Sequence, residues 1–513
     1  MSGLPCIIYA NKIIPVNHLL YKYIIMKKVH VEKFIVFLIA LFFYSMPGLA
    51  EKVQGTVFLD INRNGIKDNN ERGIPDVLVS NQKDVVKTDK NGSYEIEKLK
   101  NKVIYLVKPA EYGIDSYYLA NDINNTDFAL YPKEYKKTFD IIAVGDPQMR
   151  CKESLDAFQE DIVEEMLNYS PEFAIILGDI ADNDLSIYPR TKEMLAQLPY
   201  PVYPVFGNHD TNYQALSCED EADIFQEYWG PDYYSFDEGQ VHFIVLNNIL
   251  YEGWNKKAND KGGYFGGISE SQYEWLKNDL EYVSDNKLIV LNMHIPMLQD
   301  YVYKEQITRI FDLLKKRQHL LALSGHLHGM ENYFFNEESW WSGASFQNIT
   351  VGAACGSWWC GPKDERGIPV STCMDGSPNG YFHIRFDGNK YSYHFIPANH
   401  RTDFQLRTVY IKDKNDLYVN VFSATSEASV IAELNGQKIT LQNVMDEYDP
   451  FIEQTYNLRW NFDNWQGGKI KPKHLWKCHL PELQEGTYRI NIEVIDVDGK
   501  KYEGYKLINV FEK

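Results

Sequence analysis

Short apolar runs alternate with amphipathic stretches through the middle of the chain. The apolar runs are residues 139–144, 173–177, 202–206, 241–247, 288–292 and 320–323. The amphipathic stretches, in which apolar positions recur with the helical period, are residues 156–167, 271–282 and 304–315. Apolar strands covered by helices on both faces are typical of layered α/β domains. We therefore predict strands and helices at these positions, in an α/β domain that spans residues 133–400.

The segments on either side of this domain consist of short β-rich runs separated by Asn, Asp and Gly. These runs are residues 53–59, 76–80, 85–88 and 93–96 before the domain, and 417–422, 429–434, 487–494 and 505–510 after it. Runs of this kind, with turn residues between them, are typical of antiparallel β structure. We predict a β-sandwich at residues 51–132 and a β-sandwich-like domain at residues 401–513.

The first fifty residues, 1–50, have the three-part layout of a secretory signal peptide. Lys27 and Lys28 form a basic start, residues 34–44 are apolar, and residues 48–50 offer small side chains for cleavage. The position of the basic start suggests Met26 as the true first residue. The alternative is an uncleaved anchor, because residues 34–50 are just long enough to span a bilayer. We expect cleavage, no membrane span afterwards, and export to the periplasm or the cell surface.

The cysteines fit an exported protein. The chain has seven, and Cys6 lies in the leader. The remaining even number permits disulfides, among which a local bridge between Cys360 and Cys373 is one option because the loop between them is rich in Gly and Pro. No Cys-x-x-Cys pair is present, which removes a structural zinc site of that type from consideration.

The net charge of −19 over 513 residues argues against a nucleic-acid partner. Binding a polyanion requires clustered Lys and Arg that displace counterions, so a nuclease is disfavoured. Chemistry on a phosphate group would need another source of positive charge. Bound metal ions are the obvious source.

A calcium-loop pattern lies within the N-terminal β module. The residues that fit its ligand positions are Asp60, Asn62, Asn64, Ile66 (through its carbonyl), Asp68 and Glu71. Gly65 falls where such a loop turns sharply. The predicted flanks are strands, and the segment resembles the SdrD B-like repeat modules of bacterial surface proteins, some of which bind calcium. We predict one structural calcium ion, and the alternative is a polar Asx-rich turn.

Seven potential metal ligands follow the predicted strands of the central domain. They are Asp146, Gln148, Asp179, Asn208, His294, His326 and His328. In a parallel sheet, ligands bind beyond the carboxyl ends of the strands, so we expect these side chains to converge. Oxygen donors mixed with imidazoles suit Mn, Fe or Zn. Seven donors exceed the needs of one ion, and two neighbouring ions can stabilise an in-line phosphoryl displacement.

Residues 139 to about 397 resemble the calcineurin-like metallophosphoesterase superfamily. The resemblance rests on motifs in the family's order: Gly-Asp at 178–179, Gly-Asn-His-Asp at 207–210, His294 and Gly-His-Leu-His at 325–328. It implies a four-layer α/β/β/α domain with two metal ions. With its two β modules, the chain resembles three-domain exported bacterial phosphoesterases.

The resemblance also implies a role for each motif residue. The first metal would be held by Asp146, Gln148, Asp179 and His328. The second would be held by Asp179, which bridges the two ions, and by Asn208, His294 and His326. His209 would act as general acid or transition-state stabiliser, oriented by Asp182 or Asp210. The family usually has His where this chain has Gln148, and a neutral amide is the weaker ligand, so we expect a more labile first metal.

The segment after His328 contains a long insertion with adjacent tryptophans, at residues 352–381. Long loops inside compact domains are usually functional, and the flat face of a tryptophan can contact a ring of the substrate. We expect Trp358 and Asp375 to contact substrate. The alternative is that the tryptophans only pin the loop.

These observations predict an exported dinuclear-metal phosphoesterase that hydrolyses a phosphate mono- or diester with metal-activated water. The expected partner is a small phosphate ester. The alternative is a surface binding or adhesion protein, in which the β modules act and the phosphoesterase centre is degenerate.

Overall fold

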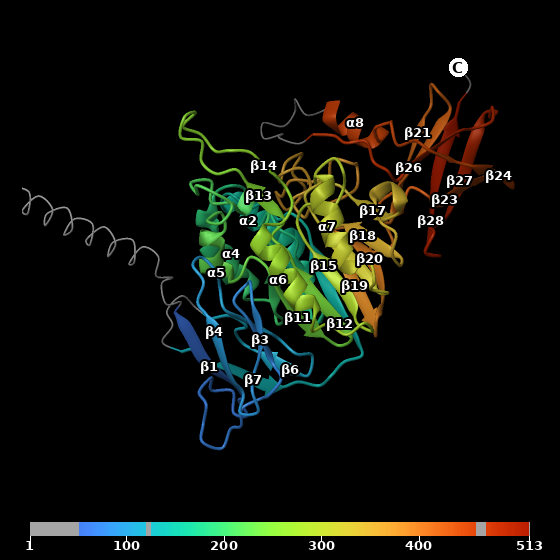
Figure 1. Ribbon diagram of the computed structural model, residues 1–513. Coiled ribbons are helices and arrows are strands. Elements are labelled where there is room, and N and C mark those ends of the chain that lie inside the picture. Colours follow the sequence, from blue (N-terminus) through green and yellow to red (C-terminus); the bar gives the residue numbers. More distant parts are fainter. Residues whose placement is uncertain (1–50, 120–124, 458–467, 512–513) are drawn as a thin grey trace, which may run out of the picture. The chain divides into compact units, whose positions relative to one another are not determined.

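The computed structural model describes residues 51–119, 125–457 and 468–511 (Figure 1). The predicted signal peptide therefore lies outside the described residues. Within the described ranges, no helix is long and apolar enough to cross a membrane.

The central domain is built on two sheets. The first has the order β10-β9-β8-β19-β20 and the second the order β11-β12-β15-β16-β18-β17. The strands of the first sheet are β8 (Thr138–Val144), β9 (Phe173–Ile176), β10 (Val202–Pro204), β19 (Gly380–Asp387) and β20 (Lys390–Pro397). Those of the second are β11 (Tyr234–Glu238), β12 (Val241–Val245), β15 (Leu288–Asn292), β16 (Leu320–Ser324), β17 (Glu331–Phe334) and β18 (Phe346–Thr350).

Aromatic side chains join the two sheets face to face. Phe173 of β9 contacts Phe236 and Phe243 of the second sheet edge-on, with ring centroids 5.3 and 5.1 Å apart. Tyr203 of β10 stacks on Phe236 at 4.1 Å. Each contact buries a large apolar surface and adds the geometric preference of paired aromatic rings. The core of the domain therefore lies between its two sheets.

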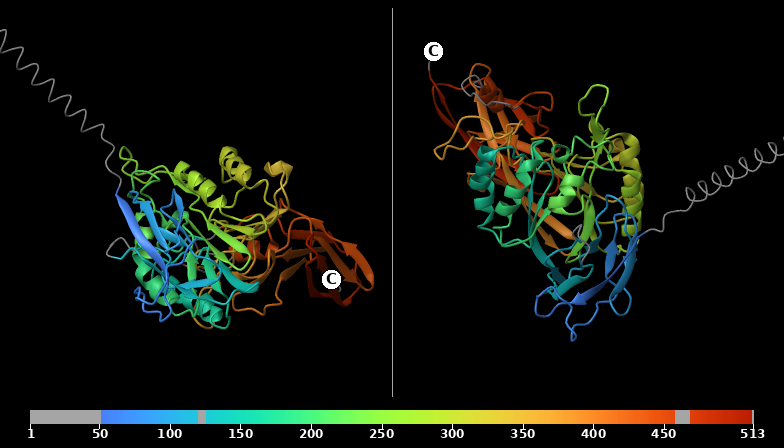
Figure 2. Two further views of the ribbon diagram at one scale, coloured as in Figure 1. Left: turned by 60° about the horizontal axis from the view of Figure 1, so that its bottom comes forward. Right: turned by 90° about the vertical axis from the view of Figure 1, so that its left-hand side faces the viewer.

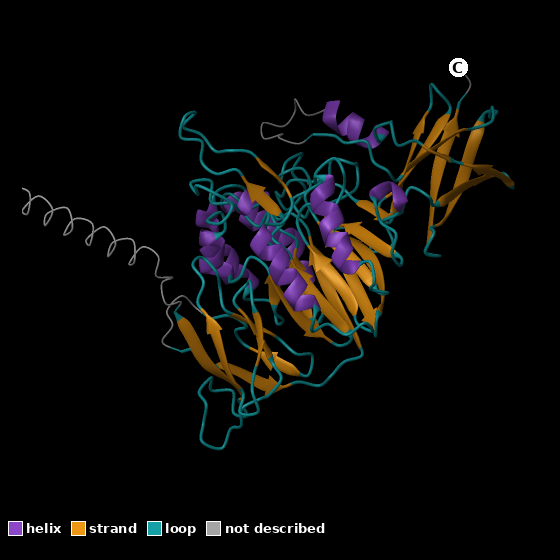
Figure 3. Ribbon diagram, viewed as in Figure 1, coloured by secondary structure: helices purple, strands orange, loops and turns teal. Residues whose placement is uncertain are grey.

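Helices cover the outer faces of both sheets. They are α2 (Lys152–Phe158), α3 (Glu164–Met166), α4 (Tyr188–Leu195), α5 (Asp223–Trp229), α6 (Glu270–Leu280) and α7 (Lys304–Leu314). In the right-hand view of Figure 2, the teal helices and the yellow-green helix α7 lie on opposite sides of the strands. Figure 3 shows the same alternation of helix and strand layers. The predicted four-layer α/β/β/α fold is confirmed.

The predicted helix at residues 156–167 begins earlier and is irregular. It starts at Lys152, and its middle turn, Gln159–Val163, is a π-helix. A π turn inserts one extra residue into the helix and often occurs at functional sites. Here it directs Asp161 toward the insertion, where its carboxylate accepts hydrogen bonds from Arg366 at 2.6 Å and Asn379 at 2.7 Å.

The N-terminal module has its own core and two small sheets, β4-β1-β7-β6 and β3-β2-β5. Its strands are β1 (Lys52–Leu59), β2 (Leu78–Ser80), β3 (Val85–Lys87), β4 (Ser93–Glu97), β5 (Tyr105–Val107), β6 (Tyr112–Ile114) and β7 (Phe128–Pro132). Buried hydrogen bonds attach the module to the central domain. Gln82 donates to Asp232 at 2.9 Å, and the indole of Trp275 donates to the Tyr105 hydroxyl at 2.9 Å.

The carboxylates of the predicted calcium loop accept hydrogen bonds from the loop's own backbone. Asp60 accepts from the amides of Asn64 and Gly65 at 3.2 and 2.8 Å. Glu71 accepts from the amides of Ile61 and Asp68 at 2.8 and 3.0 Å. These bonds fold the acidic side chains inward, as both a calcium loop and an Asx-rich turn require. Calcium binding stays a prediction.

The C-terminal module has the sheets β21-β22-β26-β25 and β24-β23-β27-β28, with a separate core between them. Its strands are β21 (Leu406–Ile411), β22 (Asp416–Val421), β23 (Ser429–Leu434), β24 (Gln437–Thr440), β25 (Gln442–Asn443), β26 (Leu475–His479), β27 (Gly486–Ile495) and β28 (Lys501–Val510). A helix, α8 (Pro450–Asn457), follows β25. The sandwich-like character expected of this region is present.

A buried histidine in the central domain gives the stability of the fold a pH dependence. The ring nitrogens of His242 lie 2.8 Å from Asp237 and 2.9 Å from Asp279. Burial alone would lower the pKa of His242, but the carboxylates of Asp279 and Asp237 outweigh it and raise this pKa to about 9. The folded-state pKa thus exceeds the roughly 6.5 of an unfolded histidine.

We predict that the stabilisation from charged His242 is fully present below about pH 6.5 and is lost as the pH rises through about 9. Its size is about 3 kcal/mol, the free-energy equivalent of this pKa difference. Urea unfolding of the wild type and His242→Gln measures it, because glutamine keeps polar contacts but does not titrate. The free-energy difference between the two proteins should shrink between about pH 6 and about pH 10. Parallel pH profiles would contradict the prediction.

Candidate functional site

The predicted ligands of the second metal meet around one imidazole nitrogen. Nε2 of His294 lies 3.1 Å from Oδ2 of Asp179, 3.1 Å from Oδ1 of Asn208 and 3.2 Å from Nδ1 of His326. Oδ1 of Asp146 is 4.0 Å away. These residues follow β8, β9, β10, β15 and β16, whose carboxyl ends lie at one edge of the two sheets. Residues far apart in sequence are therefore in contact.

The remaining predicted ligands form a second group beside Asp179. Nε2 of Gln148 lies 3.3 Å from Oδ2 of Asp179. The thiol of Cys355 connects Gln148 and His328, since its Sγ is 3.4 Å from Oε1 of the amide and 3.8 Å from Nδ1 of the imidazole. His328 is fixed by a 2.6 Å contact between Nδ1 and the carbonyl of Gly356, which leaves Nε2 as its ligand atom.

The donor set fits metal ions. Ligand atoms of Asp179, His294 and His326 all lie within 4.8 Å of one another, and the first two are buried. A buried cluster of carboxylates and imidazoles is costly unless its charges are balanced. Carboxylate, amide and imidazole donors suit Mn, Fe and Zn. The residues present can therefore hold the metals implied by their pattern.

The backbone at the site adopts unusual conformations. Five predicted ligands have a left-handed φ, with values between 41° and 75°; they are Asp146, Gln148, Asp179, His326 and His328. Such conformations cost energy in residues with a Cβ and cluster at functional sites. Hydrogen bonds hold them: the amide of His326 donates to both oxygens of Asp146 at 3.0 Å, and the amide of His209 donates to Asp179 at 2.8 Å.

The glycines of the motifs make this crowding possible. A Cβ at Gly207 would lie 2.2 Å from the backbone nitrogen of Asp179, and one at Gly325 would lie 2.6 Å from the carboxylate of Asp146. Both distances are well inside van der Waals contact. Glycine therefore precedes Asn208 and His326 because Asp179 and Asp146, respectively, approach too closely for a side chain.

The electrostatics of the cluster are strongly perturbed. Burial raises the pKa of Asp146 to about 7. Burial would also raise the pKa of Asp179, but His294 and His209 outweigh it and lower this pKa. Burial tends to lower the pKa of His294, yet Asp179 and Asp146 raise it to about 9, while burial and the neighbouring His294 lower the pKa of His326 to about 3. His294 thus carries a proton that a metal cation would replace.

His209 stands beside this cluster with its side chain 23% exposed. Nδ1 of His209 lies 3.2 Å from Oδ1 of Asp182, within ion-pair distance. The two groups are not aligned for a hydrogen bond. Asp210, the other candidate to orient it, is buried and accepts hydrogen bonds from Ala181 and the hydroxyl of Tyr188 instead. Asp182 is therefore the carboxylate next to His209.

The two tryptophans of the insertion have different positions. Trp358 stacks on the ring of His328, with centroids 4.0 Å apart and an angle of 20° between the planes. The indole N–H of Trp359 donates to the carbonyl of Pro147 at 2.7 Å. Both residues have a left-handed φ, 58° and 50°, which is unusual for bulky side chains. Trp359 pins the loop, and Trp358 remains a predicted substrate contact.

Asp375 does not have the position expected of a substrate contact. It has no exposed surface, and its carboxylate accepts hydrogen bonds from the amides of Met330 and Ser377 at 2.6 and 2.8 Å. Nε2 of His474, from the C-terminal module, lies 3.2 Å from the same carboxylate and 3.1 Å from the carbonyl of Met330. We therefore reassign Asp375 to holding the loop that carries His328. No sequence motif marks this role of His474, which lies in the C-terminal module and far from His328 along the chain.

The disulfide suggested between Cys360 and Cys373 is not formed. Cys373 is a buried thiol, so it forms no bridge with Cys360.

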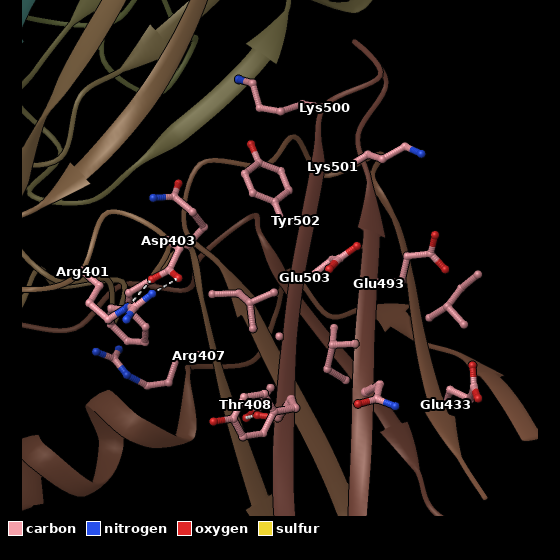
Figure 4. Close-up of a pocket in the computed structure, with 18 of the residues that line it drawn as sticks. Arg401, Asp403, Arg407, Thr408, Glu433, Glu493, Lys500, Lys501, Tyr502 and Glu503 are labelled. Atoms are coloured by element: carbon pink, nitrogen blue, oxygen red, sulfur yellow. Dashed lines mark hydrogen bonds and ion pairs between the residues drawn. The ribbon is translucent and has the colours of Figure 1, made fainter. Parts of the chain in front are cut away.

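A large groove lies away from the predicted metal ligands. It has a volume of about 1600 Å³ and lies between the segment around Arg401 and the sheet of β27 and β28 (Figure 4). Its charges are mixed, as in the hydrogen-bonded pair of Arg401 and Asp403. None of the described ligand residues lines it. The site of chemistry is therefore assigned from the converging donors and not from the size of a cavity.

Comparisons with known proteins identify the family of the chain. The sequence profile described as "Calcineurin-like phosphoesterase" matches residues 139–330, and profiles for the N and C termini of calcineurin-like phosphoesterases match residues 61–136 and 349–502. The chain belongs to the calcineurin-like phosphoesterases, and it is a metal-dependent phosphoric ester hydrolase. The family depends on a dinuclear metal centre.

Individual relatives carry different names. The chain is 28% identical over 215 residues to the probable glycerophosphodiester phosphodiesterase GpdQ of Arcobacter nitrofigilis, covering 38% of this chain and 74% of that protein. It is 24% identical over 246 residues to the serine/threonine-protein phosphatase CPPED1 of Homo sapiens, covering 42% and 74%. A dimetal phosphatase structure from Danio rerio aligns with a TM-score of 0.34 at 14% identity, covering 51% of this chain and 97% of that one.

We predict that His209→Ala lowers the rate of ester hydrolysis by about 10²–10⁴-fold, the usual contribution of a proton-transferring side chain. Metal content, measured by elemental analysis, should stay close to that of the wild type, because His209 is not among the ligands. Asp182→Asn should lower the rate by a smaller factor. Loss of metal in His209→Ala would show that this imidazole is a ligand.

We predict that His474→Ala weakens metal retention by about tenfold or more, the effect expected when the support of a ligand loop is removed. His474 contacts Asp375 and also Met330, and Met330 is two positions after His328 in the chain. Metal loss during dialysis against a chelator measures the effect. The matched control is His479→Ala, which removes the partner of Asp416 in the same module, 3.0 Å away, and should not change retention. Equal metal loss in both variants would contradict the link.

Proposed function

We propose that the chain is an exported dinuclear-metal phosphoesterase that hydrolyses a small phosphate mono- or diester with metal-activated water. The observation that carries the proposal is the convergence of carboxylate, amide and imidazole donors from five strand ends on His294. When bound, two metal ions would neutralise the charge of the phosphate and make a water molecule acidic enough to act as the nucleophile.

The residues of the chain divide into two ligand sets that share Asp179. Asp146, Gln148, Asp179 and His328 would hold the first ion, and Asp179, Asn208, His294 and His326 the second. His209 stands next to the cluster with Asp182 behind it and would donate a proton to the leaving oxygen. Trp358 would cover the first ligand set from the side of the insertion.

Export is supported by the signal-peptide pattern of residues 1–50. The net charge of −19 keeps a small phosphate ester, bound through metal, as the expected partner in place of nucleic acid. The names of the relatives include a phosphodiesterase and a phosphatase, so they support ester hydrolysis without choosing between diesters and monoesters.

We predict that the protein hydrolyses 4-nitrophenyl phosphate or bis(4-nitrophenyl) phosphate, that a chelator abolishes the activity, and that Mn²⁺ restores it. The ratio of the two rates gives the ester preference. Asp179→Asn is the control, because it removes the bridging carboxylate and should leave no activity in any metal. Failure of the metal-loaded wild type on both esters would favour the alternative, a binding protein with a degenerate centre.

We predict that the first metal is held more weakly than the second, and that Gln148→His tightens it about tenfold, because imidazole is the stronger ligand for these metals. Competitive titration with a chromophoric chelator measures the two affinities. A wild type that binds two Zn²⁺ ions equally tightly would contradict the weak-ligand role of Gln148.

A further inference from the structure

Two exposed tyrosines flank His326 at the opening of the site. The ring of Tyr301 lies edge-on to the imidazole with centroids 5.6 Å apart, and that of Tyr264 does so at 6.5 Å. Tyr264 is 39% exposed and Tyr301 is 42% exposed. A tyrosine can present an apolar ring face while its hydroxyl stays in water, which suits a binding surface beside a polar cluster.

The two tyrosines are held in place by backbone contacts. Tyr264 begins β14 (Tyr264–Gly266), which pairs with β13 (Ile249–Tyr251). The amide of Gly266 donates to the carbonyl of Tyr301 at 3.2 Å, so β14 and the segment after His294 keep a fixed relation. The backbone positions of the two tyrosines are therefore fixed relative to each other on either side of His326.

A second contact ties the β13–β14 hairpin to the ligand cluster. Nζ of Lys261, in the loop between these strands, lies 4.2 Å from the ring centre of Tyr213. The hydroxyl of Tyr213 donates to the carbonyl of Asn208 at 2.8 Å. The hairpin thus adds aromatic surface and one positive charge next to ligands of the second metal, in a protein that is acidic as a whole.

We propose that Tyr264 and Tyr301 form an aromatic wall that binds a planar ring of the substrate. This ring belongs to the alcohol that is esterified to the phosphate, as the base of a nucleotide does. This inference rests on the proposed function. The phosphate would be held at the ligand cluster, and the ring would extend outward along His326. Aromatic faces bind planar rings by stacking, with little dependence on the identity of the ring.

The test compares two esters, adenosine 5′-monophosphate and ribose 5-phosphate, of which only the first carries an adenine base. The methyl diester of each is tested in the same way. For the wild type, we expect kcat/KM to be at least about tenfold higher with the ester that carries the base. This ratio corresponds to the free energy of stacking one base on an aromatic side chain. Tyr301→Ala and Tyr264→Ala should each remove most of this preference and leave the ribose ester within about twofold. Tyr301→Phe should keep the preference, since the ring remains.

Binding provides a readout that does not depend on turnover. Calorimetric affinity for the phosphonate analogue of adenosine 5′-monophosphate should fall in the alanine variants while inorganic phosphate binds as before and metal content is unchanged. The control variant is Tyr282→Ala, because Tyr282 is 44% exposed but faces Lys87 of the N-terminal module.

Equal kcat/KM values for both esters in the wild type, or equal losses on both in the alanine variants, would overturn the aromatic wall. Hydrolysis of nitrophenyl esters in that case would leave the proposed function standing. Failure to hydrolyse any ester with metal present would instead remove the proposed function, and the wall with it.

Discussion

Burial of acidic and imidazole groups at one sheet edge is the constraint on which the rest of the structure depends. Asp146 and Asp179 are almost completely buried, and each needs a cation or hydrogen-bond donors to offset the loss of water. The amides of His326 and His209 supply part of this compensation. His294 supplies a further part, because, against the effect of burial, Asp179 and Asp146 raise its pKa to about 9, and a bound metal ion would take over this role.

The rigidity of the centre follows from the same constraint. A left-handed backbone at five ligand residues is unfavourable by itself, so the surrounding layers must impose it. The two packed sheets do this by fixing the strand ends, and glycines at 207 and 325 let those ends approach one another. Trp359 adds a contact from the insertion through its hydrogen bond to Pro147.

The sequence was most informative where one physical signal dominated. The apolar run at residues 288–292 matched β15, because a strand that is covered on both faces consists almost entirely of apolar residues. The convergence of Asp179, Asn208 and His294 followed from their place after such strands. Strands β19 and β20 were not among the predicted apolar runs, because polar residues interrupt both of them. Their partners lie far away in sequence, as in the pairing of Phe382 with Ala143.

Contacts made by single side chains across domains had no sequence signal. Asp375 was predicted to contact substrate because it lies in the long insertion after His328, yet its partners Met330 and His474 lie 45 and 99 positions away. The same holds for Tyr264 and Tyr301, since only the fold brings them to His326.

The contact with His474 also bears on the order in which the parts of the protein assemble. Chains are synthesised from the N-terminus, and the loop after His328 receives one of its supports from a residue near the end of the chain. The loop after His328 therefore acquires its full set of contacts only after the C-terminal module has been synthesised and has docked.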